Sequence, residues 1–575
     1  IVAVAARALA RGSDPIPARE ARELSPTSDD VTDVAASDVA ASDVAVAPSA
    51  QVTSTETAPA DARFVHAAAL ATGFVFLALE LVWYRMLGPL LGGSSITFGL
   101  ILATALTGIG VGSLLYARRT RPVSLGALAA TLAIEGVFVL LPFAWGDDLA
   151  FLVAHLREWG NLGFGYLVAS WVTVACIVVF PAAVVSGYQF PLLFALLGRG
   201  REGVARQIGL VYGYNTIGTI AGSLLGGFVL VPALGAVTSW RWLGVSLLVL
   251  GGIYAAASWT EKRAKNEPRW PLVPAFAVVL GVALAVTDGP GAVWRHTPIG
   301  AGRLPIARRS PNELIAKRRL MARDVIWERD GIESSVALSV RSGLQFIVNG
   351  KSDGSVIGDR GTQAFIGLLP AILHGSVKSS FVVGLGSGMT AGILGRVEEV
   401  EKVTVAELEP SIVEVARRSH AANGNVLDNP RVDIQFGDGR ELLLTSRDEY
   451  DLIVSEPSNP YRIGISALFT REFYEAADSR LRPRGYFAQW IQGYEIDAET
   501  IAIALHTMRQ VFPHVSVWGP EGTDLLLLGS HHEQVFDLAR LTELSARADY
   551  RTWIERTWLM DGPESVLAHL IVPAP

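Results

Sequence analysis

The feature that most constrains this sequence is a series of long apolar segments between Phe64 and Thr287. A membrane-spanning helix needs about 17 to 25 apolar residues to cross a hydrocarbon core roughly 30 Å thick, and these segments reach that length. Apolar residues make up 50% of the 575-residue chain, which suggests membrane segments beside a soluble domain. The sequence therefore predicts a multi-pass α-helical membrane domain with about 6 to 8 spans. The predicted spans cover residues 66–88, 94–116, 123–145, 165–196, 208–232, 238–258 and 271–287.

Glycines recur four residues apart in two of these segments. Gly108 and Gly112 share one face of the second predicted span, and Gly218, Gly222 and Gly226 share one face of the fifth. Small residues at this spacing let two helix backbones approach closely. We therefore expect both faces to pack against neighbouring helices.

The second half of the chain is organised around a buried-type strand that runs into a glycine turn. The apolar run Phe381 to Val383 leads into Gly384-Leu385-Gly386-Ser387-Gly388, and an apolar helix start follows. Glycine permits positive φ and lets a nucleoside-bearing cofactor lie against bare backbone, with the first helix amides pointing at it. Taken alone, this glycine motif is weak evidence for cofactor binding, because many strand-to-helix turns need glycine only for packing.

Acidic residues follow each of the next three strand-like runs, and these strengthen the cofactor interpretation. Glu407 and Glu409 end the second strand, Asp438 follows the third, and Glu456 follows the fourth. An acid at the tip of the second strand can bind ribose hydroxyls, and Asp438 is placed to accept from an adenine amino group. Since strand ends in an open parallel sheet share one crevice, the four tips are predicted to converge.

Three further segments complete the predicted organisation. The N-terminal segment is rich in Ala, Ser, Asp and Pro and is predicted to be a disordered tail. A basic connector is predicted to face anionic lipid headgroups. Residues 335–340 and 344–348 alternate around Arg341-Ser342-Gly343, which predicts a hairpin. The predicted domains are a tail at 1–62, a transmembrane domain at 63–290, the connector at 291–330, a small β element at 331–375, a Rossmann-like domain at 376–535 and a helical tail at 536–575.

This order of elements resembles the spermidine synthase family of polyamine aminopropyltransferases. It resembles more closely the bacterial membrane-fused form, in which a major-facilitator-like region precedes the synthase domain. The resemblance covers roughly residues 330 to 530, and less specifically 64 to 290. The motifs that carry it are the N-G-K-x-D-x-S run from Asn349 to Ser355, the turn Gly384 to Gly388, Glu407-Leu408-Glu409, Gly437-Asp438-Gly439-Arg440 and the segment Leu468 to Tyr474.

The resemblance implies an α/β Rossmann-like domain of the S-adenosylmethionine-dependent methyltransferase type, with a small N-terminal β element. It implies that an amine attacks the propyl carbon of decarboxylated S-adenosylmethionine, with Glu456 as the catalytic residue that activates or orients the amine. Asn459 stands where the soluble enzymes have a second aspartate, which weakens recognition of a dicationic acceptor. The predicted cofactor residues are Gly384, Gly386, Ser387, Gly388, Glu407, Glu409, Asp438 and Gly439, and the predicted substrate residues are Asp353, Asp359, Gln363, Asn459 and Tyr461.

The charge of the loops predicts on which side of the membrane each part of the chain lies. The loops after the second, fourth and sixth predicted spans are rich in arginine and lysine, and the positive-inside rule places them in the cytoplasm. Seven crossings would leave the residues after Thr287 outside, whereas a domain that uses a cytoplasmic nucleoside belongs inside. We expect one miscounted segment, either 271–287 or the proline-interrupted 165–196. The sequence thus predicts an inner-membrane protein with a cytoplasmic catalytic domain.

Two other functions stay open at this stage. The same sheet suits an S-adenosylmethionine-dependent methyltransferase, and Glu80, Arg85, Glu135 and Asn215 in or near the spans leave room for a transporter with a nucleoside- or polyamine-sensing domain. The net charge of −7 gives no reason to expect nucleic acid as a partner. The histidines lack metal-ligand spacing, so no metal is expected. The expected partners are a small polyamine, the lipid bilayer and a second copy of the chain in a homodimer.

Overall fold

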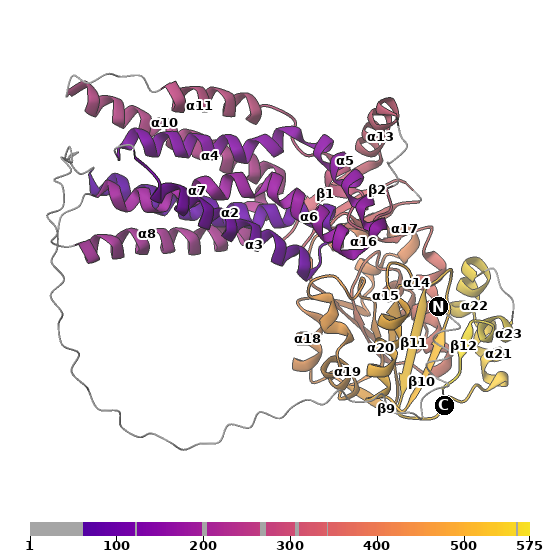
Figure 1. The fold of residues 1–575 in the computed structure, drawn as a ribbon. Helices are drawn as coiled ribbons and strands as arrows, with labels where there is room; N and C mark the ends of the chain where they lie inside the picture. The colour runs from indigo at the N-terminus through magenta and orange to yellow at the C-terminus, as the bar shows by residue number, and fades with distance from the viewer. Residues whose placement is uncertain are drawn as a thin grey trace, which may run out of the picture.

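The computed structural model describes residues 61–120, 123–197, 204–264, 272–304, 310–341, 343–558 and 562–574. Residues 1–60 of the predicted tail lie outside this part of the chain. The described residues form a bundle of long, roughly aligned helices with an α/β domain at one end (Figure 1).

The bundle supplies most of the predicted spans. Among the described residues, five helices are long and apolar enough to cross a membrane, and a bent helix pair makes a sixth candidate. The 14-residue α11 is shorter than a full span. The helices of the bundle are α2 (Ala62–Leu91), α3 (Ser95–Ala117), α4 (Leu125–Trp145), α6 (Phe164–Val178), α7 (Phe180–Leu196), α8 (Val204–Leu225), α10 (Ala236–Ala264) and α11 (Leu272–Ala285).

The predicted span 165–196 is a pair of helices rather than one straight rod. Helices α6 and α7 meet at Val179 and are bent by 53° relative to each other. Pro181 lies in the first turn of α7, where its missing N–H would have had no intrahelical acceptor. The proline that interrupts the pattern therefore marks the start of a new helix.

The glycine faces pack as expected. A Cβ on Gly112 would come within 2.0 Å of the Val184 carbonyl oxygen on α7, and one on Gly108 within 2.6 Å of the Ala183 Cβ. On α8, a Cβ on Gly222 would lie 2.2 Å from the Phe74 carbonyl oxygen of α2. No side chain fits at these distances, so both predicted packing faces are confirmed.

The helix ends next to the basic loops lie far from the α/β domain. Helices α3, α7 and α10 end, and α4, α8 and α11 begin, at the end of the bundle opposite the domain (Figure 1). Helix α11 returns alongside α4 and α10 toward the domain. The helix ends that border the predicted basic loops and the α/β domain therefore lie at opposite ends of the bundle.

A small antiparallel sheet follows the bundle. Its strands are β1 (Val325–Asp330), β2 (Ser335–Ser339), β3 (Gln345–Val348) and β4 (Lys351–Ser355), in the order β1-β2-β3-β4. Strands β2 and β3 form the predicted hairpin. Strand β1 lies inside the predicted connector, after the helices α12 (Ala292–His296) and α13 (Pro311–Asp324). The small sheet is therefore larger than predicted.

The α/β domain contains an eight-stranded sheet in the order β12-β10-β11-β9-β8-β5-β6-β7. The strands from β9 to β7 in this order are parallel, and the pairs that involve β10, β11 and β12 are antiparallel. The predicted C-terminal helical tail ends in β12, which extends this sheet. The strands are β5 (Ser379–Val383), β6 (Lys402–Glu407), β7 (Val432–Phe436), β8 (Tyr450–Ser455), β9 (Leu481–Ile491), β10 (His514–Trp518), β11 (Leu525–Ser530) and β12 (Leu570–Val572).

Helices cover both faces of the sheet. One apolar core contains residues of α14 (Arg360–His374), α15 (Met389–Leu394) and α16 (Ile412–Arg418), and the other contains residues of α18 (Gly439–Thr445), α19 (Arg471–Asp478) and α20 (Ala498–Arg509). Helices on both faces of a largely parallel sheet define a doubly wound α/β domain. The predicted Rossmann-like fold class is confirmed for this domain.

Hydrogen bonds join the bundle to the small sheet and to the α/β domain. Arg85 at the end of α2 donates to the carbonyl oxygens of Gly331 and Ile332, at 3.1 and 2.7 Å. The backbone N–H of Ile463 donates to the Gly93 carbonyl oxygen at 3.3 Å. The loop after β8 thus rests on the turn between the first two apolar helices.

Candidate active site

The four predicted strand tips lie side by side at one edge of the large sheet. In the order β8-β5-β6-β7, the residues that follow each strand include Glu456, Gly384, Glu409 and Asp438. The Glu456 N–H donates to the Val383 carbonyl oxygen at 3.2 Å, which ties the tip of β8 to the tip of β5. The carboxyl edge of the parallel strands is therefore the candidate site.

The glycine turn has the conformation that the sequence predicts. Gly384, Gly386 and Gly388 have φ of 96°, 51° and 78°, in the region that favours glycine. A Cβ on Gly388 would also lie 2.6 Å from the Val426 side chain. These glycines are thus required by the backbone, and they leave the turn without side chains at three positions.

Glu407, the last residue of β6, is hydrogen-bonded to the glycine turn. Its two carboxylate oxygens accept from the backbone N–H groups of Leu385 and Glu409, both at 2.8 Å. Burial raises the pKa of Glu407 to about 7, although these backbone hydrogen bonds lower it in part. Each oxygen keeps a second lone pair, so Glu407 can still accept from the hydroxyls of a ligand on the turn.

Asp438 begins α18. Its Oδ1 accepts from the backbone N–H groups of Arg440 and Glu441, at 2.8 and 3.4 Å, which is an N-cap. Oδ2 takes no part in these two bonds, so the residue can serve as a cap and as an acceptor for a ligand. A Cβ on the neighbouring Gly439 would lie 2.7 Å from Val383, so this glycine lets α18 pack closely on β5.

Glu409, a predicted cofactor residue, accepts backbone hydrogen bonds through both of its carboxylate oxygens. Its Oε2 accepts from the N–H groups of Glu333 and Ser334, at 3.0 and 3.1 Å, and its Oε1 accepts from Ser411 at 2.9 Å. The side chain is 4% exposed. Glu409 thus holds the β1–β2 turn against the large sheet, and its contact with a cofactor stays a prediction, because Oε1 keeps a second lone pair.

Glu456 is a buried acid at the tip of β8. Its Oε1 is buried and has no hydrogen-bond partner among the residues described. Burial raises the pKa of Glu456 to about 7, and a hydrogen bond with the Thr390 side chain lowers it in part. A carboxylate with a pKa near neutrality can take up a proton during a reaction at physiological pH.

Gln363, Ser387 and Asp359 meet at the start of α14. Ser387 Oγ is hydrogen-bonded to the Gln363 side chain, whose Nε2 donates to the Ser355 carbonyl oxygen at 3.1 Å. Asp359 accepts from the Ser355 N–H at 2.6 Å, and burial raises its pKa. These contacts bring the N-G-K-x-D-x-S run next to the glycine turn.

Asp353 and Asn459 lie together around the side chain of Lys351. Lys351 Nζ is hydrogen-bonded to Asn459 Oδ1 and lies 3.4 Å from Asp353 Oδ1. Arg462 pairs with the other Asp353 oxygen at 3.2 Å. Tyr461 donates to Glu495 at 3.1 Å. The predicted substrate residues thus already have partners within the protein.

Three polar residues near the site were not among the predicted ones. Lys351 is part of a predicted motif, but lysines in turn-rich runs are usually exposed. Gln492 follows β9, and its Oε1 accepts from Lys351 at 2.6 Å. Asp524 precedes β11, and burial raises its pKa to about 7, with a further contribution from Asp359. Only the small sheet and the late strands bring these residues to the site, so no local pattern pointed to them.

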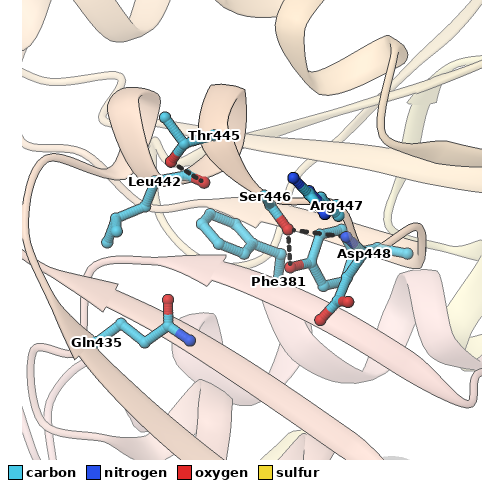
Figure 2. Close-up of a pocket in the computed structure, with 8 residues that line it drawn as sticks. Phe381, Gln435, Leu442, Thr445, Ser446, Arg447 and Asp448 are labelled. Atoms are coloured by element: carbon cyan, nitrogen blue, oxygen red, sulfur yellow. Dashed lines mark hydrogen bonds between the residues drawn. The ribbon is translucent and has the colours of Figure 1, made fainter.

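A separate pocket of about 250 Å³ lies against α18 and the strands β5 and β7 (Figure 2). Phe381, Gln435 and Leu442 contribute to its wall, and the Ser446 hydroxyl lies 3.1 Å from the Tyr450 hydroxyl. No predicted site residue lines this pocket, so it is distinct from the strand-tip site. Across the described parts of the chain, no group of three or more His, Cys, Asp or Glu side chains is arranged to hold a metal ion.

Residues 360–518 match the family model of the spermine/spermidine synthase domain. This part of the chain is therefore similar to the synthase domain of that family. The matched region runs from the start of α14 to the end of β10 and includes every strand tip described above. The predicted resemblance to spermidine synthase, and with it the prediction of an aminopropyltransferase-like enzyme, is confirmed.

Two relatives show how far the similarity extends. The polyamine aminopropyltransferase of Mycobacterium tuberculosis is 26% identical over 494 residues, which cover 83% of this chain and 85% of the relative. That of Nitrosomonas europaea is 34% identical over 145 residues, which cover 25% of this chain and 44% of the relative. The first alignment is long enough to include both the bundle and the synthase domain.

Two solved structures are also similar. A spermidine synthase in complex with the transition-state analogue AdoDATO is 21% identical, with a TM-score of 0.39, and the match covers 44% of this chain and 86% of that one. The spermidine synthase of Thermotoga maritima is 21% identical, with a TM-score of 0.38, and the match covers 44% and 85% of the two chains.

Removing the Glu407 carboxylate is expected to weaken donor binding. Because Glu407 fixes the glycine turn and can bind hydroxyls, the Glu407→Ala variant should bind the donor that the resemblance implies, decarboxylated S-adenosylmethionine, about 10-fold to 100-fold more weakly. Calorimetry on the full chain in detergent measures the change. Glu398→Gln, at a side chain that is 84% exposed, is the control and should bind the donor normally. An unchanged donor affinity in Glu407→Ala would show that Glu407 does not contribute to donor binding.

Proposed function

We propose that the protein transfers an aminopropyl group from decarboxylated S-adenosylmethionine to a small amine such as putrescine and releases 5'-methylthioadenosine. The observation that carries this proposal is the match of residues 360–518 to the synthase family, since that region contains the glycine turn, Glu407, Asp438 and Glu456. The donor nucleoside is proposed to lie on the glycine turn, with its ribose at Glu407 and its adenine at Asp438.

In the proposed reaction the acceptor nitrogen attacks the propyl carbon that is bonded to the sulfonium. A carbon–nitrogen bond forms as the carbon–sulfur bond breaks, and the bonding pair moves to sulfur, which becomes a neutral thioether. The nitrogen must be unprotonated to attack, and the new ammonium then loses a proton. Glu456, whose pKa is raised to about 7 by burial, is the group proposed to orient the amine and accept a proton.

Identification of the nucleoside product tests this proposal. The full chain in detergent is incubated with a panel of amines and either decarboxylated S-adenosylmethionine or S-adenosylmethionine. We expect amine-dependent release of 5'-methylthioadenosine from the decarboxylated donor only. Release of S-adenosylhomocysteine from the intact donor would instead identify a methyltransferase, and donor binding without any product would favour a sensor domain.

We propose that the helical bundle anchors the enzyme in the inner membrane, with the synthase domain in the cytoplasm. Five helices, or six with the bent pair, have the length and hydropathy for this role. The cytoplasmic side is proposed because the donor nucleoside is found there. This orientation places the ends of α3, α7 and α10, which precede the predicted basic loops, outside, against the positive-inside rule. A major-facilitator-like bundle and a homodimer stay predictions.

Labelling of an introduced cysteine tests on which side of the membrane the synthase domain lies. Glu533 is exposed on the synthase domain, and Cys176 is the chain's only cysteine, so Glu533→Cys in a Cys176→Ser background gives one reactive thiol on that domain. We expect a membrane-impermeant maleimide to label it only after the cells are lysed. Labelling in intact cells would place the domain outside.

A further inference from the structure

Asp524 places a buried carboxylate oxygen at the start of α14. It is the last residue of the loop between β10 and β11, and its Oδ1 is buried and has no hydrogen-bond partner among the described residues. Burial and the charge of Asp359 raise the pKa of Asp524 to about 7. Contacts with the side chains of Trp490 and Thr362, of which Thr362 lies in the first turn of α14, lower this pKa in part. The Oδ1 atom can therefore accept a hydrogen bond from a ligand.

Contacts through the first turn of α14 connect Asp524 to the strand-tip site. Thr362 contacts Asp524, and Gln363 is the next residue of the helix. The Gln363 carbonyl oxygen accepts from Thr390 Oγ1 at 3.1 Å, and the Thr390 side chain is in turn hydrogen-bonded to Glu456. Only these three residues separate the two carboxylates along this path of contacts, so Asp524 belongs to the same site as Glu456.

Asp359 adds a second carboxylate beside Asp524. It immediately precedes α14, and its Oδ2 accepts from the Ser355 N–H at 2.6 Å. Burial raises the pKa of Tyr494, and the charges of Asp524 and Asp359 raise it further, so Tyr494 lies near both carboxylates. Two negative charges this close repel each other, and a cation bound beside them would remove that repulsion.

The cations next to Tyr494 are paired with other acids. Lys351 Nζ and Arg303 Cζ lie 5.7 and 4.6 Å from the centre of the Tyr494 ring. Lys351 pairs with Asp353 at 3.4 Å, and Arg303 pairs with Glu495. Neither of the two carboxylates at the start of α14 forms an ion pair with a described residue. These two acids are thus able to bind a cation from outside the protein.

We propose that Asp524, together with Asp359, binds the unreactive ammonium of a diamine acceptor, while Glu456 orients the amine that reacts. This inference rests on the proposed aminopropyl transfer and assigns a diamine as its acceptor class. Asn459 in the loop after β8 has no charge, so an acid from the β10–β11 loop supplies the charge that a dication needs. A hydrogen-bonded ion pair of this kind should contribute about 10-fold to 100-fold to the affinity for a diamine.

Binding of two amines to the wild-type protein tests the subsite without any need for turnover. The full chain in detergent is titrated by calorimetry with putrescine and with n-butylamine, which has the same carbon chain but a single ammonium. The titrations are made at about pH 8, above the raised pKa of Asp524. We expect putrescine to bind at least about 10-fold more tightly than n-butylamine. Equal affinities for the two amines would overturn the proposal.

The Asp524→Asn variant tests which acid is responsible for this preference. Asparagine keeps the size of the side chain and removes its charge, so putrescine should bind about 10-fold to 100-fold more weakly, while the affinity for n-butylamine stays unchanged. Glu521→Gln, at an exposed acid of the same loop, is the matched control and should keep the wild-type preference. Asp359→Asn should lower the preference in the same direction, so the test does not depend on one variant folding.

Two results with these variants would contradict the proposed subsite. An unchanged preference for putrescine in folded Asp524→Asn would show that this acid does not bind the second ammonium. Equal weakening of putrescine and n-butylamine would show that Asp524 acts only through the structure of the site. These binding results stand apart from the proposed reaction, whose failure would show as the absence of 5'-methylthioadenosine with every amine.

Discussion

The Glu456→Gln variant is expected to lose at least about 100-fold in kcat, because glutamine keeps the size of the side chain but cannot accept a proton. Donor affinity should change little, since the nucleoside is proposed to contact the glycine turn and Glu407 instead. In the wild type, kcat should rise with pH through about 7 and then level off, as the Glu456 carboxyl loses its proton. The pH profile of Glu456→Gln should lack this step. Steady-state rates across the pH range measure both effects.

The same substitution should stabilise the fold at high pH. Burial raises the folded-state pKa of Glu456 from 4.5 to about 7, so the buried negative charge destabilises the protein as pH rises above 4.5. Glu456→Gln should therefore gain up to about 3 kcal/mol above pH 7 and nothing below about pH 4.5. Glu401→Gln, at a side chain that is 71% exposed, is the matched control and should leave the rate unchanged and alter stability by about 1 kcal/mol or less at any pH. Undiminished turnover in Glu456→Gln would rule out its catalytic role.

Replacing Asp330 with alanine is expected to give the largest loss of stability. Asp330 ends β1 and is 5% exposed, and its Oδ2 accepts from the Ala236 N–H at 2.7 Å and from Arg295 Nη2 at 2.9 Å. Its removal leaves a buried arginine with only the Glu328 carboxylate, 2.6 Å away, as its acidic partner. Breaking a buried pair by removing one partner costs about 3 to 5 kcal/mol, and we expect the lower end because Glu328 remains. The unfolding temperature in detergent measures the loss.

An exposed ion pair provides the control for this effect. Lys378 and Glu401 lie 3.4 Å apart with side chains 63% and 71% exposed, so Glu401→Ala should cost about 1 kcal/mol or less. Because Ala236 begins α10 and Asp330 ends the first strand after the bundle, Asp330→Ala should also weaken the attachment of the synthase domain to the helices. Equal unfolding temperatures for Asp330→Ala and Glu401→Ala would show that the Asp330–Arg295 pair does not stabilise the junction between the bundle and the synthase domain.

The strand tips could be predicted because their signals are local. A glycine turn after an apolar strand requires positive φ, and Gly384, Gly386 and Gly388 have it. Acids at the ends of apolar runs fall at the carboxyl edge of any parallel sheet, which is where Glu407 and Glu456 lie. Likewise, glycines four apart predicted helix contacts that depend only on helical periodicity.

Other parts of the structure depend on contacts that a single sequence does not display. Strand β1 has three apolar residues followed by three charged ones, so it lacks the apolar–polar alternation that identifies a half-buried strand. Glu409 follows the end of β6, where the strand no longer fixes the direction of its side chain, and two amides of the β1–β2 turn donate to its Oε2. Lys351 is buried only because the small sheet folds onto the loops after β8 and β9. The burial and the partners of these side chains are determined by tertiary packing.

The most direct test of the central claim is the mass of the acceptor after reaction. The full chain is incubated with decarboxylated S-adenosylmethionine and each amine of the panel, and the amine products are measured by mass spectrometry. We predict that one acceptor gains a single aminopropyl group and that this product is lost in Glu456→Gln. A gain of one methyl group from S-adenosylmethionine, or unmodified amines throughout the panel with a folded, donor-binding protein, would contradict the assignment of this protein as an aminopropyltransferase.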